Sequence, residues 1–459
     1  MFQPNYRLNY AFSIGQREPV AGPLADGAQV VSPVQQSVGV FGITKDGWNS
    51  VFAVFDQGAI SATRFFTTLT LGYFCSDAEL GIYAVGITVL LLAQMIHESL
   101  IVIPYSMARQ DKSARAPERL YSDALIIHFA YSLVATLVVA FFGLVAITLR
   151  PDLFVAYCLL LFALPASLLA EFIRRCCVAR LNVRLAMWLS IGNSLLQTVA
   201  ILILLANGLL NATAVFLTIG ICSWAISAYG LYAIGEATHQ WKGRAFVKRC
   251  QEFLTKSRWL VASQVVAQFY FHTPVWFLAF FKGEASVGHL AAYMALTKLL
   301  NPVVLGLSTK LCPTLAQKHS SGGSRSVRGY VVRYCLSQTV LVGAYGFALF
   351  FIAEPFLLYG FDLTSEFSIE MIVLLLIANV WFGAVSMALY HALNVSNSAA
   401  TNFKINLVAI TVCLLVGNFS IPAWGALGVI VALLSGNVAS TSVQAYAFFS
   451  GSAEGFERG

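Results

Sequence analysis

Residues 55–74 read FDQGAISATRFFTTLTLGYF, and this stretch decides the fold. Its apolar residues recur at intervals of three and four, which draws one apolar stripe along a helix. The opposite side is polar and comprises Gln57, Ser61, Arg64 and Thr68, with Asp56, Thr63 and Thr67 beside it. A helix of about 20 residues spans about 30 Å, the thickness of the hydrocarbon layer of a membrane. The stretch therefore predicts a transmembrane helix whose polar side faces protein or water.

Similar apolar stretches recur from Trp48 almost to the C-terminus. The chain is 58% hydrophobic and 11% charged, against roughly 25% charged in an average soluble domain, which excludes a soluble fold. The stretches are continuous rather than alternating, which disfavours a β-barrel, and lipid offers no partner to an open backbone. The sequence therefore predicts an all-α integral membrane protein with about twelve transmembrane helices. The expected spans are 48–74, 82–108, 120–148, 153–177, 185–206, 211–235, 259–281, 286–314, 329–353, 369–391, 403–418 and 424–449.

The basic residues predict the orientation in the membrane. The formal net charge is +7, but nearly all Lys and Arg residues fall in alternate connections, near residues 112, 180, 248 and 324. The opposite connections contain only Arg150 and Lys282. This is the pattern of cytoplasmic loops rather than of a nucleic-acid partner. We therefore expect both termini in the cytoplasm, with disordered tails at 1–46 and 451–459.

The sequence divides into two related halves. The connection at 236–258 separates an expected N-terminal six-helix bundle, 47–235, from a C-terminal one, 259–450. Three identities recur at a spacing of 207 residues: Gln57 with Gln264, Phe74 with Phe281, and Gly81 with Gly288. An even number of helices in each half predicts bundles related by a pseudo-two-fold axis along the membrane normal, with a site between them.

Several other spans carry polar residues that lipid excludes. They are Gln94 and Glu98 in the second span, Gln264, Gln268 and His272 in the seventh, and Thr297, Lys298, Asn301 and Ser308 in the eighth. Together with the first span, these helices form two repeat-equivalent pairs, so we expect them to line one water-filled cavity. The candidate substrate-binding residues are Arg64, Lys298, Gln57, Ser61, Gln94, Asn301, Gln264 and Gln268.

Arg64 and Lys298 lie near the middle of their spans. A charge at that depth costs from about 3 to more than about 10 kcal/mol, so it requires a partner or a function. One interpretation is a structural bridge from Arg64 to Asp56 or Glu98, and the other is a role of both basic residues in binding an anionic group. Asp56 and Glu98 are in turn either counter-ions or residues that couple transport to ions.

The remaining titratable residues favour ordinary structural roles. His97, His128 and His272 are interpreted as hydrogen-bonded interior histidines, and Glu171 as an ion-pair partner of the arginines that follow it. The nine cysteines show no metal-binding spacing, so neither a metal nor a cofactor is expected. No ATP-binding loop or hydrolase motif occurs, which argues against an enzyme and against transport driven by the chain's own ATP hydrolysis.

From Trp48 to Ser450 the chain resembles the polysaccharide flippases, of the Wzx and O-antigen type, in the multidrug/oligosaccharidyl-lipid/polysaccharide (MOP) superfamily. The resemblance rests on the opening helix 55–74, the acidic turn with Gly81-Ile82-Tyr83-Ala84 after it, the long second helix through Pro104, and the restart at Arg258. It implies two six-helix bundles around a cavity that opens alternately to the two sides of the membrane.

The resemblance also implies a function. Such flippases carry undecaprenyl-pyrophosphate-linked oligosaccharide from the cytoplasmic to the periplasmic leaflet of the bacterial inner membrane, for O-antigen, capsule or exopolysaccharide biosynthesis. The expected partners are that lipid-linked oligosaccharide and membrane lipids, with the polysaccharide polymerase and chain-length machinery as further candidates. Arg64 and Lys298 fit the pyrophosphate, because a guanidinium and an ammonium suit a diphosphate. The alternatives are an ion-coupled drug or metabolite antiporter and, more distantly, a membrane polymerase or glycosyltransferase.

Overall fold

The computed structural model describes residues 45–110, 117–180, 182–235, 243–298, 300, 304, 311–361, 367–395 and 399–450. The chain divides into two units, Met1–Ser50 and Val51–Gly459, and the packing below is that of the second unit. The two expected tails, except residues 45 and 46, and Asn301 lie outside the described residues.

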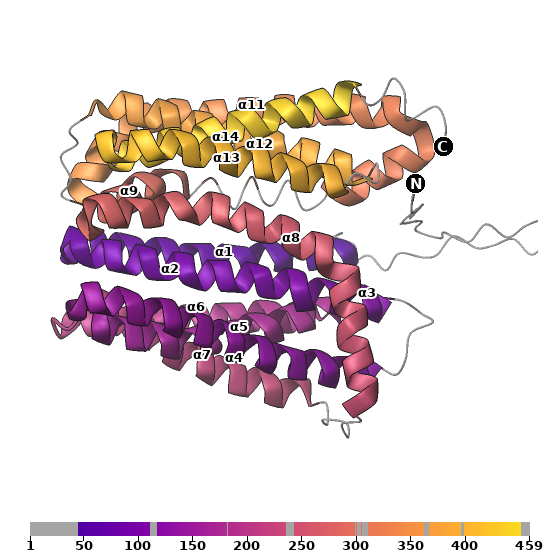
Figure 1. Ribbon diagram of the computed structural model, residues 1–459, viewed down its shortest axis with the longest axis horizontal. Helices are drawn as coiled ribbons and strands as arrows, with labels where there is room; N and C mark the ends of the chain where they lie inside the picture. Colours follow the sequence, from indigo (N-terminus) through magenta and orange to yellow (C-terminus); the bar gives the residue numbers. More distant parts are fainter. Residues whose placement is uncertain are drawn as a thin grey trace, which may run out of the picture. The chain divides into compact units, whose positions relative to one another are not determined.

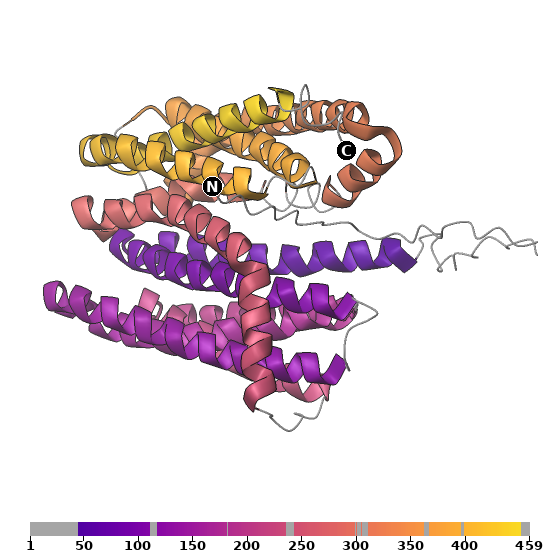
Figure 2. The same cartoon turned by 45° about the vertical axis from the view of Figure 1, so that its right-hand side comes forward.

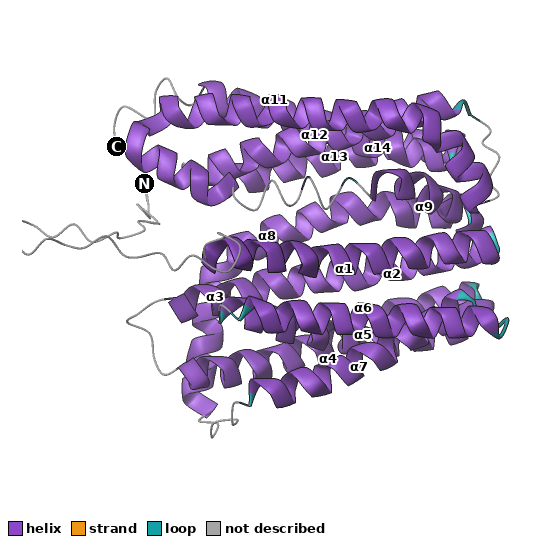
Figure 3. Ribbon diagram, turned by 180° about the vertical axis from the view of Figure 1, so that it is seen from behind, coloured by secondary structure: helices purple, strands orange, loops and turns teal. Residues whose placement is uncertain are grey.

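The described residues are helical, with short turns between the helices (Figures 1 and 3). The first group of helices is α1 (Lys45–Phe74), α2 (Asp77–His97), α3 (Ile103–Gln110), α4 (Pro117–Leu149), α5 (Phe154–Ala179), α6 (Val183–Ala206) and α7 (Ala212–Ile234). The second group is α8 (Gly243–Lys282), α9 (Glu284–Lys298), α11 (Leu311–Phe361), α12 (Ile369–Val395), α13 (Ala399–Trp424) and α14 (Ala426–Ser450). Among these residues no strand occurs, which confirms the all-α prediction.

Within the described ranges, nine helices are long and apolar enough to cross a membrane. They are Asp77–Ser106, Leu120–Val145, Pro151–Ala179, Val183–Ala206, Ala212–Ile234, Ser326–Phe361, Ile369–Leu393, Thr401–Trp424 and Ala426–Ser450. Each corresponds to one of the spans expected from the sequence. The other three expected spans fall on α1, α8 and α9, whose polar residues lower the hydropathy, and the eighth expected span also runs into undescribed residues. Twelve spans are therefore not confirmed.

The helices pack in two sets that α2 joins. In one set α5 packs against α2, α4, α6 and α7 (Figure 1). In the other set α12, α13 and α14 pack on one another, α11 packs on α12, and α13 and α14 pack on α8. Between the sets, α2 packs closely against α8 and α9. Figure 2 shows that α8 changes direction along its length, so one continuous helix contains both the basic residues after Gly243 and the start of the second half.

Helix ends follow the local sequence. The side chain of Asn211 accepts a hydrogen bond from the backbone N–H of Ala214 at 2.8 Å, which caps α7. At Gly283 and Gly425 the backbone is left-handed, with φ of 81° and 55°. Glycine adopts this conformation without a steric penalty, which allows α9 to follow α8 and α14 to follow α13 after a single residue.

The outer surface of the helices is apolar. On α4, for example, Leu133, Phe141 and Phe142 are exposed, whereas Asp123, Ser132 and His128 are buried. Lipid chains are as apolar as leucine, so large hydrophobic side chains facing outward are stable in a membrane. This distribution, with apolar residues outside and polar residues inside, is that of an integral membrane protein.

Helices α2 and α9 cross at their N-terminal ends through two glycines. A Cβ atom at Gly81 would overlap the backbone carbonyl of Glu284, and one at Gly288 would overlap that of Asp77. Asp77 and Glu284 are separated by the same 207 residues as the two glycines. Each helix thus contacts the other through a glycine that lies equally far from the acidic first residue of its helix. Two elements related by a two-fold axis contact each other in this way.

Charged and polar side chains also connect the two sets of helices at the end where α2 and α9 cross. The guanidinium of Arg150, before α5, donates to both carboxylate oxygens of Glu284 at 2.9 and 3.0 Å, and also bonds Asp152. Hydrogen bonds to Asp152 and Glu284 raise the pKa of Arg150, so this residue stays charged. The imidazole of His289 lies 3.1 Å from the carboxylate of Asp77. The ion pair of Arg150 with Glu284 and the contact of His289 with Asp77 therefore link the two sets of helices where the glycines let them approach.

Candidate functional site

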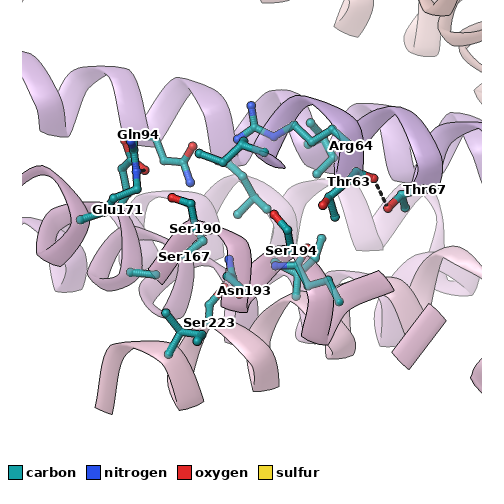
Figure 4. A pocket seen from close by; sticks show the side chains of 18 of the residues that line it. Thr63, Arg64, Thr67, Gln94, Ser167, Glu171, Ser190, Asn193, Ser194 and Ser223 are labelled. Carbon is teal, nitrogen blue, oxygen red and sulfur yellow. Dashed lines mark hydrogen bonds and ion pairs between the residues drawn. The ribbon is translucent and has the colours of Figure 1, made fainter. Parts of the chain in front are cut away.

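A polar pocket of about 110 Å³ lies among α1, α2, α5, α6 and α7. Its polar lining comprises Thr63, Arg64, Thr67, Tyr83, Gln94, Ser167, Glu171, Arg174, Ser190, Asn193, Ser194, Gln197 and Ser223. Figure 4 shows Arg64 and Thr67 on one wall and Asn193, Ser194 and Ser223 on the facing wall. The structure therefore has a polar pocket inside the first set of helices, whereas the sequence predicts a cavity between the two halves.

An ion-pair network lies at one side of this pocket. The guanidinium of Arg174 contacts Asp56 at 2.5 Å and forms two hydrogen bonds to Glu171, at 2.5 and 2.9 Å. Arg175 bonds Glu171 at 2.7 Å and Glu98 at 3.0 Å. The network thus connects α1, α2 and α5 through three carboxylates and two guanidinium groups. It confirms that Glu171 pairs with the arginines that follow it.

The innermost part of the network is fully buried. Asp56 and Arg174 are 4% and 6% exposed, and Ser190 donates a hydrogen bond to the other oxygen of Asp56. Charges removed from water are stable only when their partners satisfy them, as these are. Both acids that could have paired with Arg64 are therefore held by Arg174 and Arg175. The structural bridge from Arg64 to Asp56 or Glu98 is not formed.

Arg64 is solvent-accessible and lines the pocket. Among the described residues it has no hydrogen bond or ion pair through its guanidinium group. Removing a guanidinium from water is costly, so its place beside a polar pocket keeps it hydrated or in contact with a polar molecule. The guanidinium of Arg64 thus lines the pocket without a carboxylate partner among the described residues.

Lys298, at the end of α9, reaches the same part of α1. Its Nζ donates to the hydroxyl of Thr68 at 3.1 Å, and that hydroxyl donates to the backbone carbonyl of Arg64 at 2.8 Å. Lys298 of the second set therefore contacts α1 one helical turn after Arg64. No carboxylate pairs with either of them in the part of the chain that the structure describes.

The other predicted substrate-binding residues are dispersed. Gln94 lines the pocket with Arg64, but Gln57 and Ser61 are half-buried on α1 outside it. On α8, Gln264 donates to the sulfur of Met95 at 3.9 Å, and Gln268 is half-buried away from the pocket. The structure thus brings together only part of the predicted set.

The second transmembrane helix contains a π-helical turn, Glu98–Val102, that begins at Glu98. Turns of this kind interrupt a helix and occur often at functional sites. One residue earlier, His97 lies with its Nε2 2.9 Å from Nδ1 of His128, and both residues are buried. Hydrogen bonding of His97 and His128 inside the protein is confirmed, whereas His272 stacks on Trp276.

The sequence interpretation did not include the polar face of α6. Ser190, Asn193, Ser194 and Gln197 all line the pocket and follow the same intervals of three and four that mark α1. That spacing was the signal that could have identified them. Arg174 lies close to the basic connection near residue 180 that the sequence predicts to be cytoplasmic, because basic residues at a helix end are usually orientation signals. In the residues that the structure covers, no group of three or more potential metal ligands occurs.

The fold is shared with a solved lipid flippase and with solved multidrug transporters, one of which is described as a member of the MOP superfamily. A lipid II flippase, MurJ, in an inward closed conformation shares the fold at 15% identity and a TM-score of 0.65, over 86% of this chain and 87% of that one. An inward-facing multidrug resistance MATE family transporter of the MOP superfamily shares the fold at 13% identity and a TM-score of 0.67, over 85% of this chain and 94% of that one. A Vibrio cholerae MATE transporter, VcmN, shares it at 15% identity and a TM-score of 0.59, over 89% of this chain and 97% of that one.

Comparison of the sequence with known protein families identifies the family. The family described as "Polysaccharide biosynthesis protein" matches residues 57–319, more than half of the chain, and the chain belongs to this family. No curated protein matches the sequence. The three solved structures described above are, by their titles, a flippase and two transporters.

Proposed function

We propose that the protein flips an undecaprenyl-pyrophosphate-linked oligosaccharide from the cytoplasmic to the periplasmic leaflet by alternating access. The observation that carries the proposal is the approach of Arg64 and Lys298, two basic residues from different sets of helices without a carboxylate partner among the described residues. A pyrophosphate bound there would contact both sets at once. Its release or binding would then favour one arrangement of the sets over the other.

The same charges disfavour the antiporter alternative. The fold itself does not decide, because a lipid II flippase and MATE transporters both share it. A site for a cationic drug needs acidic groups that are free to meet the cation. Here Asp56, Glu98 and Glu171 are all paired with arginines, while Arg64 faces the pocket. The balance favours an anionic substrate.

The cellular setting is part of the proposal. We infer a bacterial inner-membrane location with both termini in the cytoplasm, from the basic connections. The proposed organisation is an N-terminal bundle 47–235, a connection 236–258 that is helical from Gly243 onward, and a C-terminal bundle 259–450. The cargo serves O-antigen, capsule or exopolysaccharide biosynthesis, and a polymerase and its chain-length machinery act on the product outside.

Loss of either central basic residue should strongly reduce export. Each charge-assisted hydrogen bond to pyrophosphate contributes about 1.5–3 kcal/mol, so Arg64→Ala and Lys298→Ala should each reduce surface polysaccharide roughly 10- to 100-fold. Arg64→Lys should retain part of the activity. Immunoblots of surface polysaccharide and of membrane-inserted protein measure both quantities.

The matched controls are Arg333→Ala and Lys404→Ala, which remove exposed basic residues with no ion pair in the described structure. Both should export polysaccharide normally. Normal export by both Arg64→Ala and Lys298→Ala would exclude pyrophosphate binding at this position.

Ion coupling is proposed for Asp56 and Glu98, of which Glu98 is the better candidate. The Glu98 side chain is 22% exposed and its partner Arg175 28%, whereas the Asp56 side chain is only 6% exposed. A proton could reach Glu98 more readily and would release Arg175. In reconstituted vesicles, Glu98→Gln should transport slowly and lose the response to an imposed pH gradient. Glu370→Gln, at an exposed acid on α12, should respond like the unmodified protein; an equal response in both variants would make Glu98 a structural counter-ion.

A further inference from the structure

The pocket among α1, α2, α5, α6 and α7 contains polar groups that the protein leaves without partners. In the described part of the chain, no side-chain hydrogen bond is formed by Arg64, Gln94, Asn193, Ser194, Gln197 or Ser223. The carboxamide oxygen of Asn193 is buried and unsatisfied, and Ser223 is 2% exposed. An unsatisfied buried amide or hydroxyl costs free energy, so these groups call for a polar occupant.

The charges of the pocket determine what kind of polar occupant fits. The three carboxylates of the network exceed its two guanidinium groups by one negative charge, whereas Arg64 on the facing wall carries one positive charge. The wall of the pocket beside Glu171 and Asp56 therefore favours no additional anion, and Arg64 opposes a cation. A neutral molecule is repelled neither by the carboxylates nor by Arg64.

The unpartnered groups of the pocket, apart from Arg64, are amides and hydroxyls, which both donate and accept hydrogen bonds. A neutral apolar molecule would leave them unsatisfied and would lose affinity for that reason. A sugar presents hydroxyls around a compact ring and can bond several of them at once. At roughly 10–15 Å³ for one water position, a pocket of about 110 Å³ has space for several waters or for a compact polar ring that replaces them.

We propose that this pocket binds one uncharged sugar unit of the lipid-linked substrate, the unit nearest the pyrophosphate. The inference rests on the proposed function, because it takes the pyrophosphate to bind where Arg64 and Lys298 meet. Arg64 connects the pocket with the proposed pyrophosphate position. It lines the pocket, and its backbone carbonyl accepts a hydrogen bond from the Thr68 hydroxyl that Lys298 contacts. A sugar attached directly to the pyrophosphate would therefore lie next to the unpartnered amides and hydroxyls.

The test compares bare and glycosylated forms of one lipid on the purified full-length protein. The probes are farnesyl pyrophosphate and four derivatives that carry a single hexose, N-acetylhexosamine, 6-deoxyhexose or uronic acid. Native mass spectrometry gives their dissociation constants. At least one of the three uncharged sugars should bind more tightly than the bare lipid, and the uronic acid should not.

Variants assign that gain to the pocket. Asn193→Leu and the milder Ser223→Ala should each reduce the sugar-dependent gain about three- to tenfold and leave the affinity for farnesyl pyrophosphate unchanged. Thr411→Val, at an exposed hydroxyl of α13 outside the pocket, should change neither quantity. Thermal unfolding shows whether each variant is folded, and Ser223→Ala decides the outcome if Asn193→Leu is not.

The outcomes separate the two proposals. No gain from any uncharged sugar, or a gain that both pocket variants retain, overturns the sugar subsite while the binding of farnesyl pyrophosphate supports the proposed function. A preference for the uronic acid also overturns it. If farnesyl pyrophosphate itself does not bind, the proposed function fails first.

Discussion

Replacing Arg174 by methionine should destabilise the protein more than any other single change in the pocket. The variant Arg174→Met would leave Asp56 and Glu171 in the interior without their main partner. Breaking a buried ion pair in this way costs about 3–5 kcal/mol, because the remaining charges stay removed from water. We expect a lower unfolding temperature in detergent and a reduced amount of protein in the membrane.

Two further variants separate the cost of unpaired charge from the loss of side-chain packing. Adding Asp56→Asn and Glu171→Gln to Arg174→Met should restore much of the stability, because neutral side chains tolerate burial better than unpaired carboxylates. Arg175→Met should cost less than Arg174→Met, since Arg175 is more exposed and Glu171 keeps its other partner. If Arg174→Met unfolded at the same temperature as Arg333→Met, the network would have no structural role.

The sequence predicts the elements of this protein better than their contacts. Continuous apolar stretches give the membrane helices, because lipid leaves a helix as the only form that satisfies the backbone. The excess of polar residues in 55–74 also identifies α1 as a helix that faces the interior. Nine of the twelve expected spans correspond to apolar helices, and the polar residues that mark α1 for function are those that lower its hydropathy.

The candidate site could be predicted only in part. The depth of Arg64 and Lys298 in their spans singles them out, and the two residues do lie close together. The partners of Asp56 and Glu98 could not be read from the sequence, since Arg174 and Arg175 are more than 75 residues away from both along the chain. Their position at a helix end gives the same signal as an ordinary cytoplasmic arginine. The pocket also depends on which faces of α5, α6 and α7 turn toward α1, and packing decides that.

The contact between α2 and α9 is likewise a property of the fold. Recurrence at 207 residues suggests a repeat, but it does not say that Gly81 and Gly288 face each other's helix. In the structure these glycines hold one end of the two sets together, with the ion pair of Arg150 with Glu284 and the contact of His289 with Asp77. That end carries the acidic connections, which we propose to face the periplasm.

Adding one methyl group at this crossing should favour the arrangement that is open to the periplasm. In Gly288→Ala the new Cβ would overlap the backbone carbonyl of Asp77, and in Gly81→Ala that of Glu284. Backbone atoms cannot move aside as a flexible side chain can, so each change should cost the closed arrangement about 1–3 kcal/mol. This corresponds to a roughly 5- to 150-fold shift toward the open one. Transport should fall, because a cycle needs both arrangements.

The shift can be measured from outside the cell. In a background without native cysteines, Ser61→Cys on α1 reports access to the interior through its rate of reaction with a membrane-impermeant maleimide. Gly288→Ala and Gly81→Ala should both accelerate that reaction and leave the amount of protein in the membrane largely unchanged. Gly58→Ala is the matched control, because its Cβ would meet no atom within 4 Å and should leave the rate as it was. Equal rates in all three variants would mean that the glycine crossing does not hold the periplasmic end closed, and the closure would then depend on the contacts of Arg150 and His289.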